Sequence, residues 1–209
     1  VNGRFEKIGK INNKSTIILD YAHTPEALKT CLQNLKDQFI NKKISIVFGC
    51  GGSRDQSKRR IMGKIANHYC DKIYLTDDNP RKENPKKIRS EIKKLIIKSK
   101  LIEMPNRSSA IKKAIKHLRT GEVLVVAGKG HENIQDYGNK KKFFSDKKII
   151  LKYIKIKNKN LSKDLKINIL KEVSENKNIS LETKIKNASI NSKVIKKNDI
   201  FFAIKGKNK

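Results

Sequence analysis

The sequence predicts an α/β fold, with a doubly wound, mostly parallel sheet of the Rossmann-like kind and an incomplete small α/β segment after it. Along residues 1–156, short apolar runs rich in Ile and Val alternate with amphipathic stretches of helix length. Continuous apolar runs are typical of parallel strands buried on both faces, and helices between them indicate a sheet covered on both sides. Ligands of such sheets bind at the carboxyl ends of the strands.

Four segments are expected to form the strands. Each is bounded by Gly, Asp or Asn, which are common where strands end in turns. They are residues 16–19, 44–48, 73–75 and 123–127. Because a polar motif follows each run directly, we expect the four motifs to gather at one edge of the sheet.

Three stretches between the strands are expected to be helices. Residues 25–39 have Thr24 as N-cap and Pro25 in the first turn, both typical of a helix start. The other two helices are expected at residues 85–97 and 108–118. Apolar residues on one side of the first two are predicted to face the core. They are Ala27, Leu28, Cys31, Leu32 and Leu35 on the first helix, and Ile88, Ile92, Leu95 and Ile96 on the second.

The formal net charge of the chain is +30, from 50 basic and 20 acidic side chains. Such a charge favours nucleic-acid binding when it is concentrated on one face. Here all but eight of the basic residues are lysines, which are spread over turns, helices and tail without a recognition-helix or RNA-binding motif. We therefore expect no specific nucleic-acid partner. A basic Rossmann-like module that binds nucleotide or nucleic acid without catalysis stays as the alternative hypothesis.

The three cysteines, Cys31, Cys50 and Cys70, are widely spaced and lack metal-ligand spacing, so free and mostly buried thiols are expected. No apolar stretch reaches the roughly 20 residues that a spanning helix needs, and no signal-peptide core follows Val1. We therefore expect a cytoplasmic protein without a membrane partner. Because the chain starts at Val1 and stops at Lys209 in mid-pattern, it is interpreted as a fragment of a longer polypeptide.

Residues 76–81, Thr-Asp-Asp-Asn-Pro-Arg, place acids, an amide and an arginine on one turn after the third apolar run. Arg81 can grip a carboxylate through two parallel hydrogen bonds, Asp78 can accept from an ammonium group, and Asn79 can donate to a second carboxylate. Pro80 stiffens the turn. The grouping suits a small zwitterion, although an ordinary turn without a ligand is the alternative.

The first apolar run is followed by residues 20–25, Asp-Tyr-Ala-His-Thr-Pro. A carboxylate at the end of the strand and an imidazole before the helix are expected to reach the same crevice. Asp20 could orient a ribose or a metal-bound water, and His23 could meet a phosphate. The alternative is that Asp20 caps the loop and His23 is an ordinary surface group.

Two glycine motifs follow the remaining runs. In residues 49–55, glycines are expected to bring backbone amides and Arg54 close to a ligand, because they can adopt positive φ and carry no side chain in the way. In residues 127–132, Glu132 suits an ammonium group, with the Gly128 carbonyl helping. Neither motif fits a P-loop or a dinucleotide fingerprint.

Four other polar residues near the motifs are given no ligand role. Arg59 and Arg60 are expected to be solvated on the helix after the glycine turn. Lys129 is expected to be a solvated lysine, with screening of a phosphate as the alternative. His131 resembles a catalytic base but is left unassigned.

The four motifs, in this order and spacing, resemble the C-terminal domain of the Mur ligases that add meso-diaminopimelate in peptidoglycan synthesis. Four linked motifs are far more specific than any one of them. The resemblance covers about residues 1–155 and rests on Tyr21-Ala22-His23-Thr24-Pro25, on Phe48-Gly49-Cys50-Gly51-Gly52-Ser53-Arg54-Asp55, on Asp78-Asn79-Pro80-Arg81 and on Ala127-Gly128-Lys129-Gly130-His131-Glu132.

The resemblance implies an ATP-dependent, amide-forming ligase that joins meso-2,6-diaminopimelate to UDP-N-acetylmuramoyl-L-alanyl-D-glutamate. ATP and Mg²⁺ are then the cofactors, held mainly by a central domain that carries the P-loop and is absent from this sequence. Residues 1–156 would form the C-terminal domain, which binds the amino acid and closes over ATP. By itself this part is expected to be catalytically inactive.

The resemblance and the residue chemistry together assign two groups of residues. Those expected to bind diaminopimelate are Arg54, Asp78, Asn79, Arg81, Gly128 and Glu132. Those expected on the nucleotide side are Arg4, Asp20 and His23, of which Asp20 and His23 are the candidate catalytic residues. No metal ligand is expected in the chain. Arg81 favours diaminopimelate over lysine, because lysine has no second carboxylate for the guanidinium.

The composition changes after residue 156. Residues 157–163 are expected to be a polar linker, and residues 165–173 a short amphipathic helix. The pattern at residues 187–193 and 199–206 resembles the opening of the UDP-binding N-terminal domain of a second Mur ligase, the D-alanyl-D-alanine-adding one, at residues 164–209. Asn191 and Lys193 stand where that pattern usually has aspartate and arginine. An ordinary strand pair is the alternative.

Overall fold

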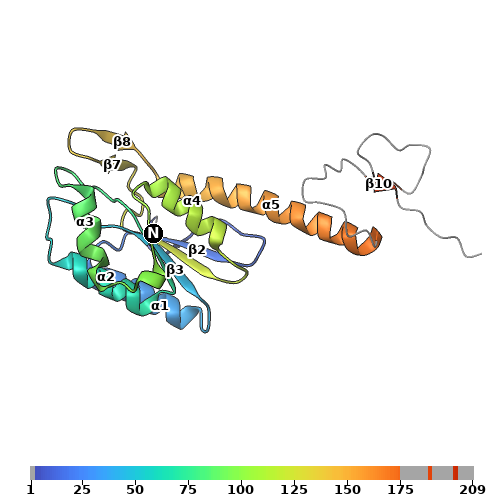
Figure 1. Ribbon diagram of the computed structural model, residues 1–209, viewed down its shortest axis with the longest axis horizontal. Coiled ribbons are helices and arrows are strands. Elements are labelled where there is room, and N and C mark those ends of the chain that lie inside the picture. The colour runs from blue at the N-terminus through green and yellow to red at the C-terminus, as the bar shows by residue number, and fades with distance from the viewer. Residues whose placement is uncertain (1–2, 175–187, 190–199, 202–209) are drawn as a thin grey trace, which may run out of the picture. The chain divides into compact units, whose positions relative to one another are not determined.

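The structure is a computed structural model that describes residues 3–174, 188–189 and 200–201. The chain divides into two compact units, residues 1–161 and 162–209. The first unit contains the main sheet, the helices α1 to α4 and the first part of α5 (Figure 1). In the second, the short strands β9 (Ala188–Ser189) and β10 (Ile200–Phe201) pair in parallel.

The main sheet has six strands in the order β1-β2-β6-β3-β4-β5. All neighbouring pairs are parallel except β1 with β2. The strands are β1 (Glu6–Lys7), β2 (Thr16–Asp20), β3 (Ile44–Phe48), β4 (Lys72–Leu75), β5 (Leu101–Glu103) and β6 (Val123–Ala127). The predicted doubly wound α/β sheet is therefore confirmed, and the four central strands are those expected from the apolar runs.

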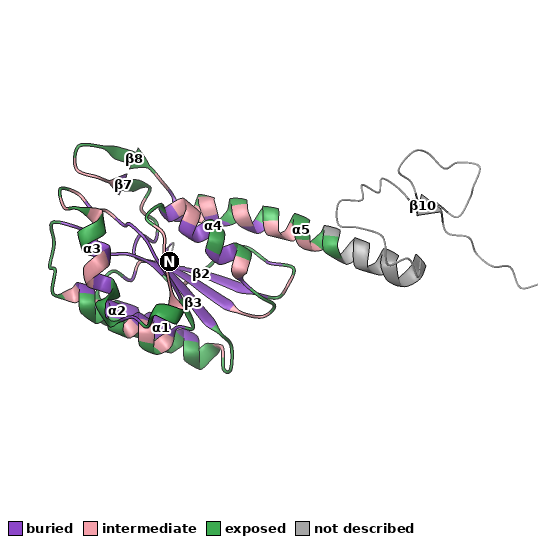
Figure 2. Ribbon diagram, viewed as in Figure 1, coloured by how far each residue is buried: buried purple, intermediate pink, exposed green. Residues whose placement is uncertain are grey.

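Helices cover both faces of this sheet (Figures 1 and 2). One apolar cluster packs Ile18, Ile46 and Val125 against the side of α1, α2 and α3. The other packs the alternate strand residues, such as Ile17 and Leu124, against α4 and α5. The helices are α1 (Pro25–Gln38), α2 (Lys58–Tyr69), α3 (Pro85–Ile92), α4 (Arg107–His117) and α5 (Asp146–Ser174), with the short 3-10 turns η1 (Lys93–Leu95) and η2 (Lys98–Lys100).

The predicted start of α1 is confirmed, because Thr24 accepts a hydrogen bond from the backbone N of Ala27 at 3.3 Å. Two details of the apolar faces are wrong. Ala27 is exposed. Leu95 is 49% exposed, because α3 ends at Ile92 and the chain continues in a 3-10 turn that changes the direction of the side chains.

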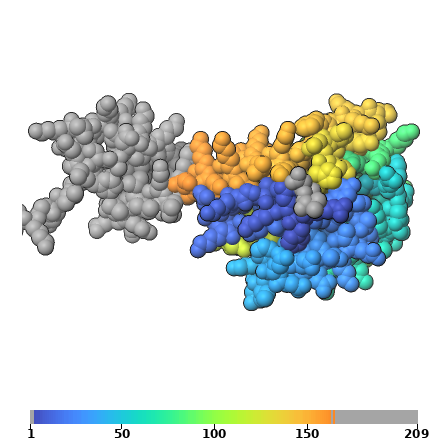
Figure 3. Space-filling view, turned by 180° about the vertical axis from the view of Figure 1, so that it is seen from behind, coloured from blue at the N-terminus to red at the C-terminus, as the bar shows by residue number. Residues whose placement is uncertain are grey.

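The expected linker at residues 157–163 is instead part of α5, which runs without a break from Asp146 to Ser174. Ile150, Ile154 and Leu161 recur at helical spacing and pack on the second apolar cluster. Within the first unit, α5 lies beside residues 6–12 (Figure 3), since Asn158 donates to the Lys10 carbonyl at 2.9 Å. The pattern attributed to a second ligase lies almost wholly outside the described residues, so its domain boundaries stay a prediction.

A two-stranded hairpin, β7 (Ile134–Asp136) and β8 (Lys141–Phe143), supports the turn after β4. The Gln135 side chain donates to the carbonyls of Asp77 at 3.3 Å and Asp78 at 2.9 Å. The sequence analysis did not predict this hairpin.

All three cysteines are free and buried, as expected. Burial raises the pKa of Cys31 and of Cys50 to about 12, so neither thiol is ionised near neutral pH. Cys50 in the glycine turn is thus a packing residue, with its sulfur 3.6 Å from that of Met62.

In the part of the chain that the structure describes, no helix is long and apolar enough to cross a bilayer.

Arg107, the first residue of α4, ties three elements together at the carboxyl end of the sheet. Its guanidinium is fully buried and donates to both carboxylate oxygens of Asp146, at 2.9 and 2.7 Å, and to the carbonyl of Ala127 at 2.9 Å. Burial would lower the pKa of Arg107, but the charge of Asp146 raises it above its ordinary value. The ion pair therefore holds the starts of α4 and α5 to the end of β6.

Replacing Arg107 with leucine should lower the free energy of unfolding by about 3–5 kcal/mol, because it leaves the Asp146 carboxylate buried without its partner. Urea unfolding followed by circular dichroism measures this loss. The double variant Arg107→Leu with Asp146→Leu is the control, and should recover most of the stability because no charge remains buried. A loss below about 1 kcal/mol in the single variant would contradict this account of the anchor.

Candidate functional site

The turns after β2, β3, β4 and β6 meet at the carboxyl edge of the sheet, where the sequence placed its motifs. The backbone N of Gly52 donates to the Asn79 carbonyl at 2.9 Å, and Arg81 Nη1 donates to the Gly52 carbonyl at 2.8 Å. Lys129 Nζ donates to Asn79 Oδ1 at 2.8 Å. Direct hydrogen bonds thus join the loops after β3, β4 and β6 into one cluster.

The glycine turn is needed for close approach rather than for positive φ. A Cβ on Gly49 would lie 2.1 Å from the carbonyl oxygen of Thr76, and one on Gly52 would lie 1.9 Å from that of Pro80. Neither residue has positive φ, and the left-handed residue in this turn is Ser53, at φ 51°. The expected conformational role of these glycines is therefore wrong. Their lack of a side chain is what lets two loops touch.

Arg81 also adopts the left-handed conformation, at φ 52°, which is costly for a residue with a side chain. The turn is held there because the Arg81 backbone N donates to the Asp136 carbonyl at 3.0 Å. One guanidinium nitrogen is fixed on Gly52. Nε and Nη2 have no acceptor among the described residues, so this edge of the fork can receive a carboxylate.

The hydrogen bonds of Asn79 determine the orientation of its amide. Oδ1 accepts from Lys129 Nζ at 2.8 Å and from the backbone N of Asp136 at 3.0 Å, so the other side must be the NH₂ group. That group donates to Glu132 Oε2 at 3.1 Å. Within residues 3–174 its second hydrogen has no acceptor, and it can bind an oxygen of a ligand.

Lys129 is fully buried, so the expectation that it is solvated is wrong. Its ammonium group lies 2.8 Å from Asn79 Oδ1, 3.1 Å from Glu132 Oε2 and 3.9 Å from Asp78 Oδ1. A buried lysine remains charged only when such partners offset its desolvation. Lys129 therefore fixes both side chains that the sequence analysis assigned to ligand binding.

The two oxygens of Glu132 are used unequally. Oε2 accepts from both Lys129 and Asn79, whereas the Tyr21 hydroxyl, at 3.4 Å, is the only donor to Oε1 in the part of the chain that the structure describes. Burial raises the pKa of Glu132, but the hydrogen bond and charge of Lys129 outweigh it and hold the pKa below its ordinary value. Glu132 is therefore ionised at neutral pH, and Oε1 is the oxygen with room for a ligand donor.

Asp78 lies in the interior, although the sequence suggested that it meets an ammonium group. Its carboxylate is 3.8 Å from Arg107 and 3.9 Å from Lys129. Burial raises the pKa of Asp78, while those two cations oppose the rise. Gly128, at φ +110°, leaves room for it, since a Cβ there would lie 2.8 Å from Asp78 Oδ2. Asp78 thus supports Lys129 from within the protein.

Arg54 and Arg60 are exposed, as expected for Arg60. Arg59 is not solvated, which corrects the prediction for that residue. Its side chain is fully buried and bonds Glu83 and Glu91, each at 2.8 Å. Arg59, in the first turn of α2, therefore ties this helix to the turn before α3 and to the last turn of α3.

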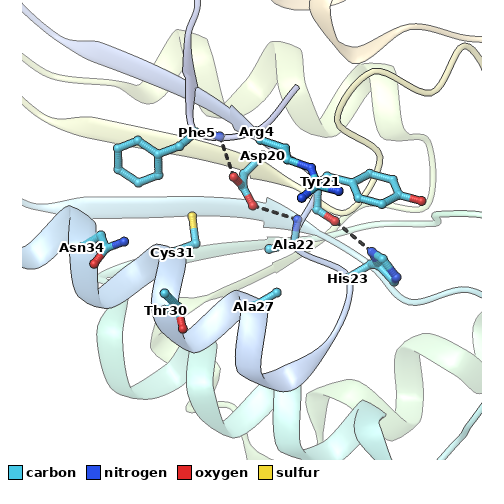
Figure 4. A pocket seen from close by; sticks show the side chains of 10 residues that line it. All are labelled: Arg4, Phe5, Asp20, Tyr21, Ala22, His23, Ala27, Thr30, Cys31 and Asn34. Atoms are coloured by element: carbon cyan, nitrogen blue, oxygen red, sulfur yellow. Dashed lines mark hydrogen bonds between the residues drawn. The ribbon is translucent and has the colours of Figure 1, made fainter. Parts of the chain in front are cut away.

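A pocket of about 470 Å³ lies between β2, α1 and the residues before β1 (Figure 4). It is lined by the second group of candidate residues, Arg4, Asp20 and His23. Asp20 accepts from the backbone N of Phe5 at 2.6 Å and of Ala22 at 2.7 Å. His23 Nδ1 donates to the Tyr21 carbonyl at 2.9 Å, so the neutral ring presents Nε2 as an acceptor. The pocket is lined by Arg4, Phe5, Asp20, Tyr21, Ala22, His23, Ala27, Thr30, Cys31 and Asn34.

The sequence analysis missed Arg107, Lys129, Tyr21 and Gln135 as members of the site. Arg107 carried one usable signal, since arginine is rare in this lysine-rich chain. Tyr21 and Lys129 stand inside the quoted motifs, but the contacts that show their roles are made to Glu132 and Asn79 in other motifs, and the partners of Gln135 lie far away in the sequence. Among the described residues, no group of three or more His, Cys, Asp or Glu side chains could hold a metal ion.

Lys129→Met should raise the pKa of Glu132, because burial then acts without the cation that opposes it. In the unaltered chain the low pKa of Glu132 stabilises the fold above the unfolded value of about 4.3, and this stability is lost as the pH falls through the folded pKa. Carboxyl-detected NMR titration measures the change. Lys112→Met, on the outer side of α4, is the matched control. An unchanged Glu132 pKa in Lys129→Met would refute the role given to the lysine.

Two curated proteins that are similar to this chain have the same function in their names. The UDP-N-acetylmuramoyl-L-alanyl-D-glutamate-2,6-diaminopimelate ligase of Rickettsia rickettsii is 49% identical over 157 residues, covering 75% of this chain and 32% of that protein. The ligase of the same name from Buchnera aphidicola is 47% identical over 162 residues, covering 76% and 31%. The chain thus spans about a third of the length of these relatives.

Solved structures and a family model also show similarity to Mur ligases. A structure of a UDP-N-acetylmuramoyl-L-alanyl-D-glutamate-2,6-diaminopimelate ligase matches with a TM-score of 0.68 and 36% identity, covering 75% of this chain and 32% of that one. A murein peptide ligase from Psychrobacter arcticus, at 16% identity and a TM-score of 0.53, covers 75% and 30% and shares the fold. The family model described as Mur ligase, glutamate ligase domain, matches residues 3–130, which is more than half of the chain. The chain therefore belongs to the Mur ligase family and contains its C-terminal, glutamate ligase domain.

Proposed function

We propose that this chain is the C-terminal part of an ATP-dependent ligase that joins meso-2,6-diaminopimelate to UDP-N-acetylmuramoyl-L-alanyl-D-glutamate in peptidoglycan synthesis. Its part would be to bind the amino acid and to close over ATP. The observation that carries the proposal is that one hydrogen-bonded loop cluster holds Arg81, with an open guanidinium edge, together with Asn79, whose amide donates to the ionised Glu132. The names of the similar ligases support it.

In the proposed complex, an ammonium group of diaminopimelate donates to Glu132 Oε1 and to the Gly128 carbonyl. The carboxylate at the same end is bound by Arg81, with the exposed Arg54 and the free Asn79 N–H as further donors. Because the protein already holds the Glu132 carboxylate and the Arg81 guanidinium in place before the ligand arrives, these side chains lose little conformational freedom on binding. The other amino group of the ligand then extends toward the reaction centre.

The pocket around Asp20 suits a nucleoside. It has a charged side, from Arg4 and Asp20, and an apolar side that includes Phe5 (Figure 4). ATP would supply the phosphoryl group that activates the acceptor carboxylate. Asp20, held by two backbone amides, would bind the ribose, while Arg4 and His23 would face the phosphates.

Mg²⁺ is proposed to accompany the triphosphate and to be held mainly outside this chain, because hard cations need several oxygen ligands. The 209 residues contain no GxxxxGK[ST] pattern, so the phosphate loop would also lie elsewhere in the ligase. Free, buried cysteines suit a reducing compartment, which supports a cytoplasmic location.

Arg81→Lys should weaken meso-diaminopimelate binding by about 10- to 100-fold, because a lysine cannot replace the bidentate contact. Titration calorimetry of the purified chain at near-physiological salt measures this loss. Arg60→Lys, on an exposed part of α2, is the matched control and should bind normally. L-Lysine should give no signal, since it lacks the second carboxylate.

The same experiment separates the alternative, a basic module that binds nucleic acid. A short DNA duplex is titrated in parallel. Saturable DNA binding that survives Arg81→Lys, without any signal from diaminopimelate, would overturn the proposed function.

For the last part of the chain, we propose the opening of the UDP-binding domain of a second, D-alanyl-D-alanine-adding Mur ligase. Support comes from the sequence pattern at residues 187–193 and 199–206 alone. Saturation-transfer NMR with UDP should detect contact in the full chain and none in a chain ending at residue 174. Equal signals from both chains would contradict this proposal.

A further inference from the structure

Tyr21 lies between the two proposed ligand sites and touches both. It is one of the residues that line the pocket around Asp20, and Figure 4 shows its side chain on the same side as His23. Its hydroxyl reaches Glu132 Oε1 at 3.4 Å. We propose that Tyr21 is a positioning residue that couples occupancy of the nucleotide pocket to amino-acid binding at Glu132. This inference rests on the proposed function.

The ring of Tyr21 is held between groups from both sites. Its centroid is 4.6 Å from that of His23, in an edge-on arrangement, and 5.5 Å from that of His131, in a stacked one. Gly130 leaves the space for this ring, because a Cβ there would lie 2.9 Å from Tyr21 Cβ. A displacement of the ring therefore presses directly on the loop that carries Glu132.

On the pocket side, Tyr21 belongs to a turn whose residues are hydrogen-bonded to one another. Asp20 accepts from the backbone N of Ala22, and His23 donates to the carbonyl of Tyr21 itself. A ligand that binds Asp20 and His23 thus constrains the backbone from which the Tyr21 side chain extends. A nucleotide can therefore restrict the position of the Tyr21 hydroxyl through the backbone, without touching the tyrosine side chain.

On the amino-acid side, the hydroxyl contacts the less occupied oxygen of Glu132. The bond to Oε1 is long, whereas Oε2 is held by two donors. Burial raises the pKa of Tyr21, with the charge of Glu132 adding to the rise, so the hydroxyl keeps its proton and can only donate in this contact. A carboxylate oxygen accepts more than one hydrogen bond, so the hydroxyl and a ligand ammonium group can share Oε1. Fixing the hydroxyl orients Oε1 for the ammonium group, and the coupling is positive.

The coupling is measured as a ratio of two dissociation constants. Calorimetry gives the affinity of the chain for meso-diaminopimelate with and without a saturating non-hydrolysable ATP analogue. We expect the analogue to tighten binding about fivefold or more in the unaltered chain, a typical size for such coupling. In Tyr21→Phe, which keeps the ring and loses the hydroxyl, the ratio should fall to about one. Tyr153→Phe on α5 is the matched control and should keep the full ratio.

A second readout needs no ligand. The pKa of Glu132, followed by carboxyl-detected NMR, should rise in Tyr21→Phe because one donor to its carboxylate is lost. An unchanged pKa, or an equal affinity ratio in Tyr21→Phe and the unaltered chain, would overturn the coupling while leaving the proposed function intact. Absence of any diaminopimelate binding in the unaltered chain would overturn the proposed function and the coupling with it.

Discussion

The buried ion pair between Arg107 and Asp146 is the interaction on which the site depends. It joins the starts of α4 and α5 to the end of β6, just before the loop that carries Lys129 and Glu132. Desolvating these charges is costly, so the cluster is stable only when its members are paired. Asp78 extends the cluster by lying within 4 Å of both Arg107 and Lys129. The fold and the site are therefore stabilised by the same charges.

The buried charged network fixes the positions of the side chains that face the ligand. Lys129 orders Asn79 and Glu132, and it keeps Glu132 ionised in spite of its burial. Backbone contacts hold Arg81 in a left-handed conformation. In this conformation its guanidinium lies in the loop cluster, where we propose that it binds the carboxylate of the ligand. Few of these groups need to move when a ligand binds, which is the arrangement expected of a site that positions an amine for attack.

Much of the fold and the identity of the motif loops could be predicted from the sequence, since buried parallel strands are continuous apolar runs. The edge strands β1 and β5 have only two or three residues and show no usable periodicity. The expected linker was wrong because its polar composition hid the spacing of Ile154 and Leu161 on α5. Lys129 and Arg59 were taken as solvated because Asn79, which binds the lysine, and Glu83, which binds the arginine, lie on other elements, and only the tertiary structure brings these together.

A two-dimensional amide NMR titration of the chain with meso-diaminopimelate would test most directly whether this preordered network is an amino-acid site. We expect saturable shifts at Asn79, Arg81 and residues 128–132, with none at the lysine-rich outer side of α4. Shifts spread over the lysine-rich surface, or centred on the pocket beside α1, would contradict it.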